Sequence, residues 1–597
     1  MRILKGLKFV GSVFLIAIFL CQSGQAAVQG VEANDQAIDQ PNVILVLTDD
    51  QGYGDLSAHG NPVLETPVLD RLHGQSIRFT NFHVTPMCTP TRGELMTGRD
   101  AMDNGATMVN QGRSMMRAEL PTMADIFKQN GYHTAHFGKW HLGDSYPHRP
   151  QDRGFEETVH HGAWGVGSIA DYYTNDYWDD TYRHNGKLKQ YEGYCTDVWF
   201  DVAIDYLEKM KQKKHPFFMY LATNAPHAPH RVADKYSDPY VEESIKPRIA
   251  KFFGQIANID ENMGRLLRAL DRTNQSENTI LIFMTDNGTV RGHTVFNAGM
   301  RGHKTEPYEG GHRVPFFMRW NEEKIGPPRS VDGLARSTDV LPTLIDLAQL
   351  DKPDNTQFDG ISLAPRLKGD QDALNDRMFV IDYDNPYRPK EDKVVLWNDW
   401  RLVKHTELYD LSEDPAQENN IAGEHPEIVS KMQSHYNRWK EQTLPHYNEK
   451  RYIHIGTEHQ NPLMLYSSDW LGTYADGVWN LVEGDDTGRW TVKVKQPGTY
   501  RISLYRWPPA SETPLDAPYD VEGRQEGGEL PISLARLKVG DIERTKKARS
   551  GAAKVEFTVE LQKGPNSIET WFMDRDKNVL CSAYYTKVQL LENNKNE

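Results

Sequence analysis

Asn42-Val43-Ile44-Leu45-Val46-Leu47, followed by Thr48-Asp49-Asp50, is the stretch of sequence that decides the fold. It is a continuous apolar run that ends in two carboxylates, and similar apolar runs occur at 217–222 and 279–284. Runs of this length without polar alternation are typical of strands that are buried on both faces of a mainly parallel sheet. The sequence therefore predicts a buried strand at each of these places.

Segments with helical periodicity lie between or beside these runs, at 121–130, 196–211 and 250–272. Strands that alternate with helices favour an α/β sandwich, whose ligands bind at the carboxyl ends of the strands. Polar side chains follow two of the predicted strands at that end: Asp49, Asp50, Asp286 and Asn287.

The chain of 597 residues is too long for one ordinary hydrophobic core. We expect an α/β domain over 40–375, and short strands with a helix at 426–443 indicate a small α+β subdomain over 376–454. Strands that alternate with turn signals then predict a β-sandwich over 455–597, which is an ordinary domain size.

Residues 1–27 have the pattern of a secretory signal peptide, in which basic residues precede an apolar run at 9–20 and small residues follow at 24–27. A membrane anchor is an alternative, but the apolar run is short for a bilayer span. A lipid on Cys21 is a second alternative, although no small residue stands just before it. We expect an exported protein, periplasmic or secreted, with no membrane span in the mature chain.

The composition is that of a globular protein, with a net charge of -15. This charge argues against a nucleic-acid partner but leaves room for an anionic substrate in a locally positive pocket. Once a signal peptide is removed, Cys88, Cys195 and Cys581 remain. Three cysteines do not make a disulfide scaffold, and whether Cys195 and Cys581 pair stays open. At least one thiol is left over for chemistry.

Cys88-Thr89-Pro90-Thr91-Arg92 is the start of the most specific motif, and Gly93-Glu94-Leu95-Met96-Thr97-Gly98-Arg99 follows directly. The stretch resembles the C-x-P-x-R-x-x-x-L-x-T-G-R signature of the type I sulfatases, whose cysteine is oxidised to formylglycine. Further matches to this family occur in the family's order, at 49–55, 66–72, 138–143, 226–227, 285–288, 301–315 and 407–415. The resemblance implies an alkaline-phosphatase-like sulfatase fold for 40–375 and the family's small C-terminal subdomain after it.

A metal site is predicted at the strand ends that carry Asp49, Asp50, Asp286 and Asn287. These side chains offer hard oxygen ligands, which suit Ca²⁺ or Mg²⁺. A single Asp pair is more often a turn or a helix cap, but two polar pairs at separate strand ends favour a metal. The resemblance implies calcium, with Cys88 as a further ligand.

The resemblance also implies how sulfate is attacked. Hydrated formylglycine from Cys88 would supply a hydroxyl that the metal acidifies and that attacks sulfur. Arg92, Lys139 and Lys304 would hold positive charge against the sulfate oxygens. A formylglycine-generating or sulfatase-maturating enzyme is then a required partner.

Two histidines take proton-transfer roles by their position in the matching motifs. His227, aided by Lys304, would protonate the leaving alcohol, and His141 would deprotonate the remaining hydroxyl so that sulfate is expelled. The chain departs from the family at Thr91, where serine is commoner, and at 304–308, where the spacing after the lysine differs. The second departure concerns the shape of the loop more than the role of Lys304.

The residues that would contact the substrate beyond its sulfate group are less well defined by the sequence. Polar and aromatic side chains that would suit a sugar ring, or that simply fill loops, are His160, His161, Trp164, Asp171, Tyr172, Arg291, His293, Arg301 and His303. The β-sandwich adds aromatics that could form its core or stack on sugars: Trp470, Tyr474, Trp479, Trp490, Tyr505, Trp507 and Trp571.

Three functions follow from these observations. We expect a sulfatase that acts on sulfated polysaccharide or oligosaccharide, either algal, such as ulvan, or from a host glycan. A phosphate ester or phosphonate hydrolase on the same fold is an alternative, which rates on matched sulfate and phosphate esters would distinguish. A non-catalytic glycan-binding protein is the other alternative, although the full set of candidate residues argues against it.

Overall fold

The computed structural model describes residues 40–242, 245–383, 393–519 and 528–591. The predicted signal peptide over 1–27 lies outside the described residues. Within these residues, no helix has both the length and the apolar character that a membrane crossing requires.

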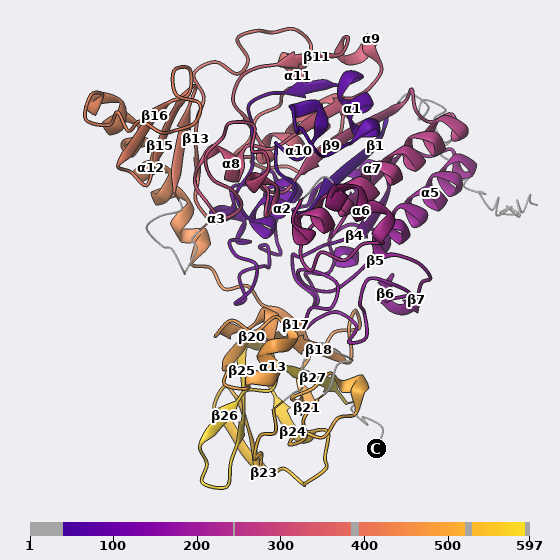
Figure 1. Ribbon diagram of the computed structural model, residues 1–597. Coiled ribbons are helices and arrows are strands. Elements are labelled where there is room, and N and C mark those ends of the chain that lie inside the picture. Colours follow the sequence, from indigo (N-terminus) through magenta and orange to yellow (C-terminus); the bar gives the residue numbers. More distant parts are fainter. Residues whose placement is uncertain (1–39, 243–244, 384–392, 520–527, 592–597) are drawn as a thin grey trace, which may run out of the picture.

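A mixed sheet of ten strands forms the centre of the larger part of the molecule (Figure 1). Its strand order is β11-β2-β10-β9-β1-β8-β4-β5-β6-β7, and the run from β9 to β5 is parallel. The strands are β1 (Asn42–Thr48), β2 (Ile77–Phe79), β4 (His133–Gly138), β5 (Glu157–His160), β6 (Thr181–His184), β7 (Lys187–Gln190), β8 (Phe217–Ala222), β9 (Thr279–Thr285), β10 (Phe316–Arg319) and β11 (Arg329–Val331).

The apolar run that opened the sequence analysis is β1, at the middle of this sheet between β8 and β9. Its side chains alternate between two hydrophobic cores, one on each face of the sheet. Val43, Leu45 and Leu47 pack into one core, and Ile44 and Val46 pack into the other. Burial on both faces explains why the strand shows no polar alternation.

Helices cover both faces of the sheet, which makes the α/β sandwich. The first core takes side chains from α2 (Cys88–Thr97), α4 (Met123–Gln129) and α10 (Val340–Ala348). The second takes side chains from α1 (Pro67–Gly74), α5 (Cys195–Lys213) and α7 (Pro247–Thr273). The predicted α/β fold class is confirmed, and each predicted helix is present with slightly different bounds.

A four-stranded antiparallel sheet follows in the chain, in the order β13-β14-β15-β16. Its strands are β13 (Met378–Ile381), β14 (Val394–Trp397), β15 (Trp400–Val403) and β16 (Glu407–Asp410). Helix α12 (Pro426–Tyr447) packs its Met432, Tyr436 and Trp439 against one face of this sheet. A sheet covered by one helix is the α+β arrangement that the sequence predicts for this segment.

The C-terminal part consists of two antiparallel-rich sheets that enclose one core, seen in orange and yellow in Figure 1. One sheet has the order β17-β20-β25-β22-β23, with β19 and β26 at its sides, and the other has the order β18-β27-β21-β24. The strands are β17 (Ile453–Ile455), β18 (Leu463–Tyr466), β19 (Leu471–Gly472), β20 (Gly488–Val494), β21 (Gly498–Tyr505), β22 (Leu534–Val539), β23 (Ile542–Lys547), β24 (Val555–Leu561), β25 (Gly564–Met573), β26 (Val579–Cys581) and β27 (Tyr585–Leu590).

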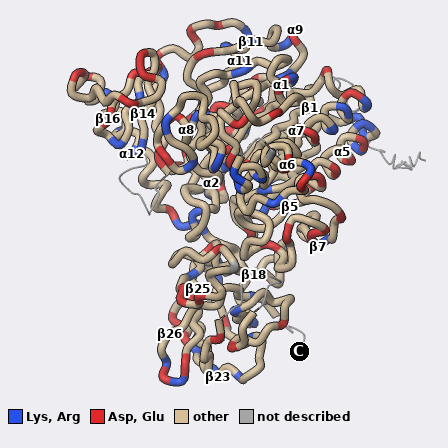
Figure 2. Tube along the Cα trace, viewed as in Figure 1, with Lys and Arg blue, Asp and Glu red and all other residues tan. Residues whose placement is uncertain are grey.

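Both core and surface aromatics occur in this sandwich. Trp470, Trp490 and Trp507 are buried in its core, whereas Trp479 is 40% exposed. Figure 2 shows acidic and basic residues interspersed along the described parts of the chain.

Candidate active site

The four predicted oxygen ligands of the metal lie together at the carboxyl ends of two adjacent strands. Asp49 and Asp50 follow β1, Asp286 and Asn287 follow β9, and all four are buried. The parallel register of the two strands brings the pairs side by side, and the amide N–H of Asp50 donates to Asp286 Oδ1 at 3.1 Å. Asp50 has a positive φ of 69°, so the chain turns sharply as it leaves the strand.

Helix α2 brings Cys88 and Arg92 to the same place, because residues four apart lie on one face of a helix. Cys88 is the first residue of the helix and is buried. Its sulfur and one carboxylate oxygen each of Asp49 and Asp286 lie within 4.8 Å of one another. The Arg92 guanidinium donates to Asp286 Oδ2 at 2.7 Å. Burial raises the pKa of the Cys88 thiol, although Lys139 and Lys304 oppose this shift.

Two lysines complete a set of buried ion pairs. Lys139 follows β4 and its Nζ donates to Asp49 Oδ2 at 2.6 Å, while Lys304 donates to Asp50 Oδ1. Burial alone would raise the pKa of Asp50, but the charges of Lys304, His227 and Lys139 together with the Lys304 hydrogen bond outweigh burial and hold that pKa well below its usual value. Burial and the neighbouring Asp49 raise the pKa of Asp286 to about 7.

The tautomers of the two histidines follow from their hydrogen bonds to backbone carbonyls. His141 Nε2 lies 2.9 Å from the Val109 carbonyl oxygen. Because a carbonyl oxygen can only accept a hydrogen bond, the imidazole proton is on Nε2. The lone pair of Nδ1 therefore faces Cys88 Sγ, at a distance of 3.5 Å. His227 Nδ1 donates to the Ala228 carbonyl at 2.7 Å, and its Nε2 lies 3.7 Å from Asp50 Oδ2. Burial lowers the pKa of both imidazoles, that of His227 to about 3.

The acidic group has the properties of a cation site. Asp49 Oδ1, Asp50 Oδ2 and Asn287 Oδ1 are buried acceptors with no hydrogen bond from the described residues. Buried oxygens are costly to leave unsatisfied, and carboxylate and amide oxygens are what Ca²⁺ and Mg²⁺ bind. Asn287 Nδ2 donates to Asp50 Oδ1 at 2.9 Å, which directs the amide oxygen away from that bond. These residues therefore fit a hard divalent cation.

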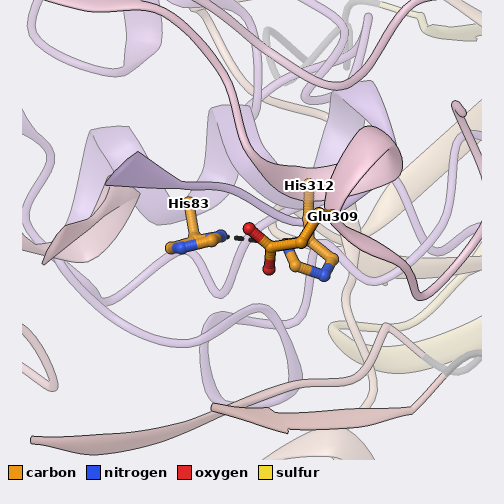
Figure 3. Close-up of side chains that lie close together, drawn as sticks. All are labelled: His83, Glu309 and His312. Atoms are coloured by element: carbon orange, nitrogen blue, oxygen red, sulfur yellow. Dashed lines mark hydrogen bonds between the residues drawn. The ribbon is translucent and has the colours of Figure 1, made fainter. Parts of the chain in front are cut away.

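A second group of potential ligands, His83, Glu309 and His312, lies elsewhere in the domain (Figure 3). Here the charge is already compensated, because Arg401 Nε donates to Glu309 Oε1 at 2.7 Å. The two imidazoles lie 2.9 Å apart through their Nδ1 atoms, and Asn81 Oδ1 accepts from His83 Nε2 at 2.6 Å. Since Arg401 comes from β15, this network joins the four-stranded sheet to the α/β domain.

A cavity of about 540 Å³ opens over the buried reactive groups. Cys88, His141, His227 and Lys304 line it together with residues from several other parts of the chain. These other residues are Met87, Val109, Trp164, Val166, Gly167, Tyr177, Ala228, Pro229, Arg231, Arg248, Tyr474, Asp476 and Trp479. The volume is that of a site for a small ligand or a sugar unit.

Of the nine loop residues that the sequence offered for the substrate, Trp164 alone is among the residues that line this cavity. His160 is buried at the end of β5, and His161 and Asp171 are buried in the loop that follows it. Arg301 lies with its guanidinium 3.8 Å from the Tyr308 ring centroid and donates to the Gln417 carbonyl at 2.9 Å. These four side chains have packing partners of their own, so ordinary loop filling describes them better.

Several lining residues were missed by sequence reasoning. Arg231 stands four positions after His227, and its place beside a matching motif could have suggested it. Arg248 lies in the first turn of α7, and Asp476 lies in the β-sandwich far along the chain. No local pattern marks these last two, because only the tertiary fold brings them to the cavity.

Buried cations around a cysteine, next to acidic strand ends that fit a hard metal, define a hydrolase of anionic esters on an α/β sheet. A model of the sulfatase family matches residues 41–350, and a model described as N-sulphoglucosamine sulphohydrolase, C-terminal, matches 303–450. The chain therefore belongs to the sulfatase family, whose enzymes hydrolyse sulfuric esters.

Named relatives agree with this assignment. The chain is 29% identical to an ulvan-active sulfatase of Formosa agariphila, over 71% of this chain and 85% of that protein. It is 31% identical to a canine N-acetylgalactosamine-6-sulfatase over 56% of this chain and 67% of that protein. The crystal structure of Ps i-CgsB in complex with k-i-k-neocarrahexaose superposes with a TM-score of 0.62 at 25% identity, over 68% of this chain and 94% of that chain.

Proposed function

We propose that this sulfatase is exported, binds calcium, and removes sulfate from sulfated polysaccharide or oligosaccharide with a formylglycine formed from Cys88. The observation that carries the proposal is the buried cluster in which Cys88 Sγ lies beside both the acidic group and His141 Nδ1. A nucleophile needs a base and an activating cation within contact distance. In this cluster His141 would be the base, and the acidic group would hold the cation.

Calcium would be held by Asp49, Asp50, Asp286 and Asn287, with the group at position 88 as a further ligand. When bound, it supplies positive charge that acidifies a hydroxyl and withdraws charge from a sulfate oxygen. Magnesium would meet the same oxygens but prefers a stricter octahedral geometry. The hydrate of formylglycine at position 88 supplies the attacking hydroxyl.

The charges of this chain's own side chains suit a sulfate ester. Arg92, Lys139 and Lys304 carry three positive charges against the three carboxylates of Asp49, Asp50 and Asp286. A divalent cation would therefore leave the site with a surplus of positive charge, which favours an anionic ester and stabilises charge that develops on sulfate oxygens. Because these cations are buried, little water screens their attraction.

Proton transfer is assigned to the two histidines. His141 presents the Nδ1 lone pair to position 88, so it can accept a proton from a hydroxyl there. His227 presents Nε2 on the wall of the cavity, where an alcohol leaving group would depart, and Lys304 lines the same wall. His227 would give the alcohol its proton, and the bound negative charge of a substrate favours the protonated imidazole that this needs.

A glycan substrate is favoured by the cavity and by the relatives. Trp164, Tyr474 and Trp479 give the wall apolar faces of the kind on which sugar rings stack. One named relative is an ulvan-active sulfatase, and others are N-acetylgalactosamine-6-sulfatases. Export, which residues 1–27 indicate, would bring the enzyme to extracellular polymers.

The test is made on protein purified from its native host. The mass of the peptide that spans Cys88 is measured, together with sulfate release from a panel of sulfated algal and animal oligosaccharides. We expect a loss of about 18 Da at Cys88, sulfate release, and no activity in the Cys88→Ala variant. Unmodified Cys88 in exported protein that releases no sulfate would refute the proposal and favour glycan binding without catalysis.

A further inference from the structure

We infer that the C-terminal β-sandwich forms one wall of the substrate cavity and selects the sulfated sugar through Trp479, so that it is part of the active site and not a separate sugar-binding module. The inference rests on the proposed function, since it concerns the same cavity. It names the substrate class more closely, as an oligosaccharide long enough to reach from position 88 to this domain.

The first support is where the sandwich meets the α/β domain. Tyr474, Asp476 and Trp479 line the same cavity as Cys88 and His227. The backbone N–H of Ile169 donates to the Asp476 carbonyl at 3.1 Å, and Trp164 Nε1 donates to the same oxygen at 3.1 Å. These bonds fix the sandwich against the loop that carries Trp164.

Side-chain hydrogen bonds join the β-sandwich to the α/β domain at a second place. Asn110 Nδ2 donates to Asp476 Oδ2 at 3.0 Å, and Gln111 Nε2 donates to the Gly472 carbonyl at 3.0 Å. Ile169 and Met115, which belong to the α/β domain, are buried in the hydrophobic core of the sandwich. A wall held by packing and by hydrogen bonds keeps its shape, as a selective site requires.

The second support is the gradient of exposure along the cavity. Cys88 is 1% exposed and His141 is 3% exposed, whereas Trp479 is 40% exposed. The reactive groups therefore lie at the closed end, and Trp479 lies toward solvent. A sulfate held at position 88 would place its sugar, or the next sugar in the chain, beside Trp479.

The third support is a row of rings that joins the two ends. The Trp164 ring lies 5.3 Å from the His227 ring and 6.5 Å from the Trp479 ring, measured between centroids. Trp164 comes from the α/β domain and Trp479 from helix α13 (Val478–Glu483) of the sandwich. Aromatic faces from two domains thus flank the path from the leaving group to solvent, and sugar rings bind between such faces.

A second partly exposed tryptophan of the sandwich provides a matched control. Trp571 is a partly exposed tryptophan on β25, and the Arg536 guanidinium lies 4.2 Å from its ring centroid. It is not among the residues that line the cavity. If the sandwich acted as a separate sugar-binding module, Trp571 would be as good a platform as Trp479.

The experiment compares Trp479→Ala, Trp479→Phe and Trp571→Ala with the wild type, all as full-length matured protein with thermal unfolding measured in parallel. Two substrates are used: 4-nitrophenyl sulfate, which is too short to span the cavity, and the sulfated oligosaccharide that the wild type hydrolyses fastest. Trp479→Ala should lower kcat/KM for the oligosaccharide by about tenfold, mainly by raising KM. Activity of Trp479→Ala on 4-nitrophenyl sulfate should fall by a clearly smaller factor than activity on the oligosaccharide.

Trp479→Phe should keep most of the oligosaccharide activity, and Trp571→Ala should behave as wild type on both substrates. Equal activity of Trp479→Ala and wild type on the oligosaccharide, or an equal loss on both substrates, would overturn the inference. So would a wild type that cleaves 4-nitrophenyl sulfate and no oligosaccharide. A wild type that cleaves neither substrate would instead refute the proposed function.

Discussion

Asn287 is the residue whose side chain most clearly needs a cation. Its amide nitrogen is engaged by Asp50, and its buried oxygen has no hydrogen bond from the described residues. A neutral ligand among carboxylates lets a hard cation bind without further negative charge. We therefore predict that calcium stabilises the folded protein through the Asn287 side chain.

Calcium at a hundredfold excess over its dissociation constant should stabilise the protein by about 2.7 kcal/mol. For a domain of this size the melting temperature should then rise by about 2 to 4 °C. Asn287→Ala should remove most of this rise, because the amide oxygen is lost and Asp50 loses a donor. Differential scanning calorimetry with chelator and with calcium measures both values.

Asn278→Ala is a matched control, since Asn278 lies before β9 and its Nδ2 donates to the Gln40 carbonyl at the opposite end of the strand. It should keep the full calcium shift. An Asn287→Ala protein that calcium stabilises as much as wild type would contradict the assignment of this ligand.

At the scale of elements, the loop after β9 and helix α8 (Glu309–His312) approach each other so closely that only glycine fits between them. A Cβ on Gly288 would lie 1.9 Å from the Gly310 carbonyl oxygen. Backbone cannot move aside as a flexible side chain can, so the loop that carries Asn287 would have to shift. The proposed metal site therefore depends on the packing of backbone against backbone.

Gly288→Ala should lower both the melting temperature and the affinity for calcium, because the clash displaces Asn287. Gly74→Ala is the comparison, since a Cβ there has nothing within 4 Å. It should change neither property. Calcium titration by isothermal calorimetry makes the test, and unaltered calcium binding in Gly288→Ala would argue against this dependence.

The helices and strands also show how much of the fold and of the site can be predicted from the sequence. The unbroken apolar run of β1 predicts a central strand, and the acidic pairs at two strand ends predict neighbours because parallel strands end at one edge. Motif matches add Arg92, Lys139, His141, His227 and Lys304, which the fold brings around Cys88. Lys304 reaches Asp50 even though the loop after it departs from the family's spacing.

The sequence does not predict which residues of the β-sandwich line the cavity. Trp479 and Trp490 have the same residue type and lie close together in the chain, yet Trp490 is buried in the core and Trp479 is exposed. Their difference depends on how the sandwich docks, which involves loops without periodic patterns. The candidates His160 and His161 fail for the same reason, since both are buried where β5 ends and neither lines the cavity.

At the scale of the whole molecule, the sandwich also supports the reactive end of the cavity. Asp476 accepts from Asn110, and the neighbouring Val109 carbonyl holds His141 in the tautomer that presents Nδ1 to position 88. Under the proposed function, we therefore expect Asp476 to position His141 through one loop of the α/β domain.

Asp476→Ala should lower kcat by about tenfold on both short and long substrates, with KM for 4-nitrophenyl sulfate unchanged. Asp476→Asn should lose less, because an amide oxygen can still accept from Asn110. Asp541→Ala changes an exposed carboxylate of the same domain and should have no effect. A normal kcat in a folded Asp476→Ala protein would contradict the link.

The central claim is sulfate ester hydrolysis that depends on Cys88, and one paired rate measurement tests it most directly. The protein purified from its native host and its Cys88→Ala variant are assayed on 4-nitrophenyl sulfate and 4-nitrophenyl phosphate, with calcium present. The account predicts that the wild type hydrolyses the sulfate ester faster than the phosphate ester, and that the variant falls to background on both. Faster hydrolysis of the phosphate ester, or full activity without Cys88, would contradict it.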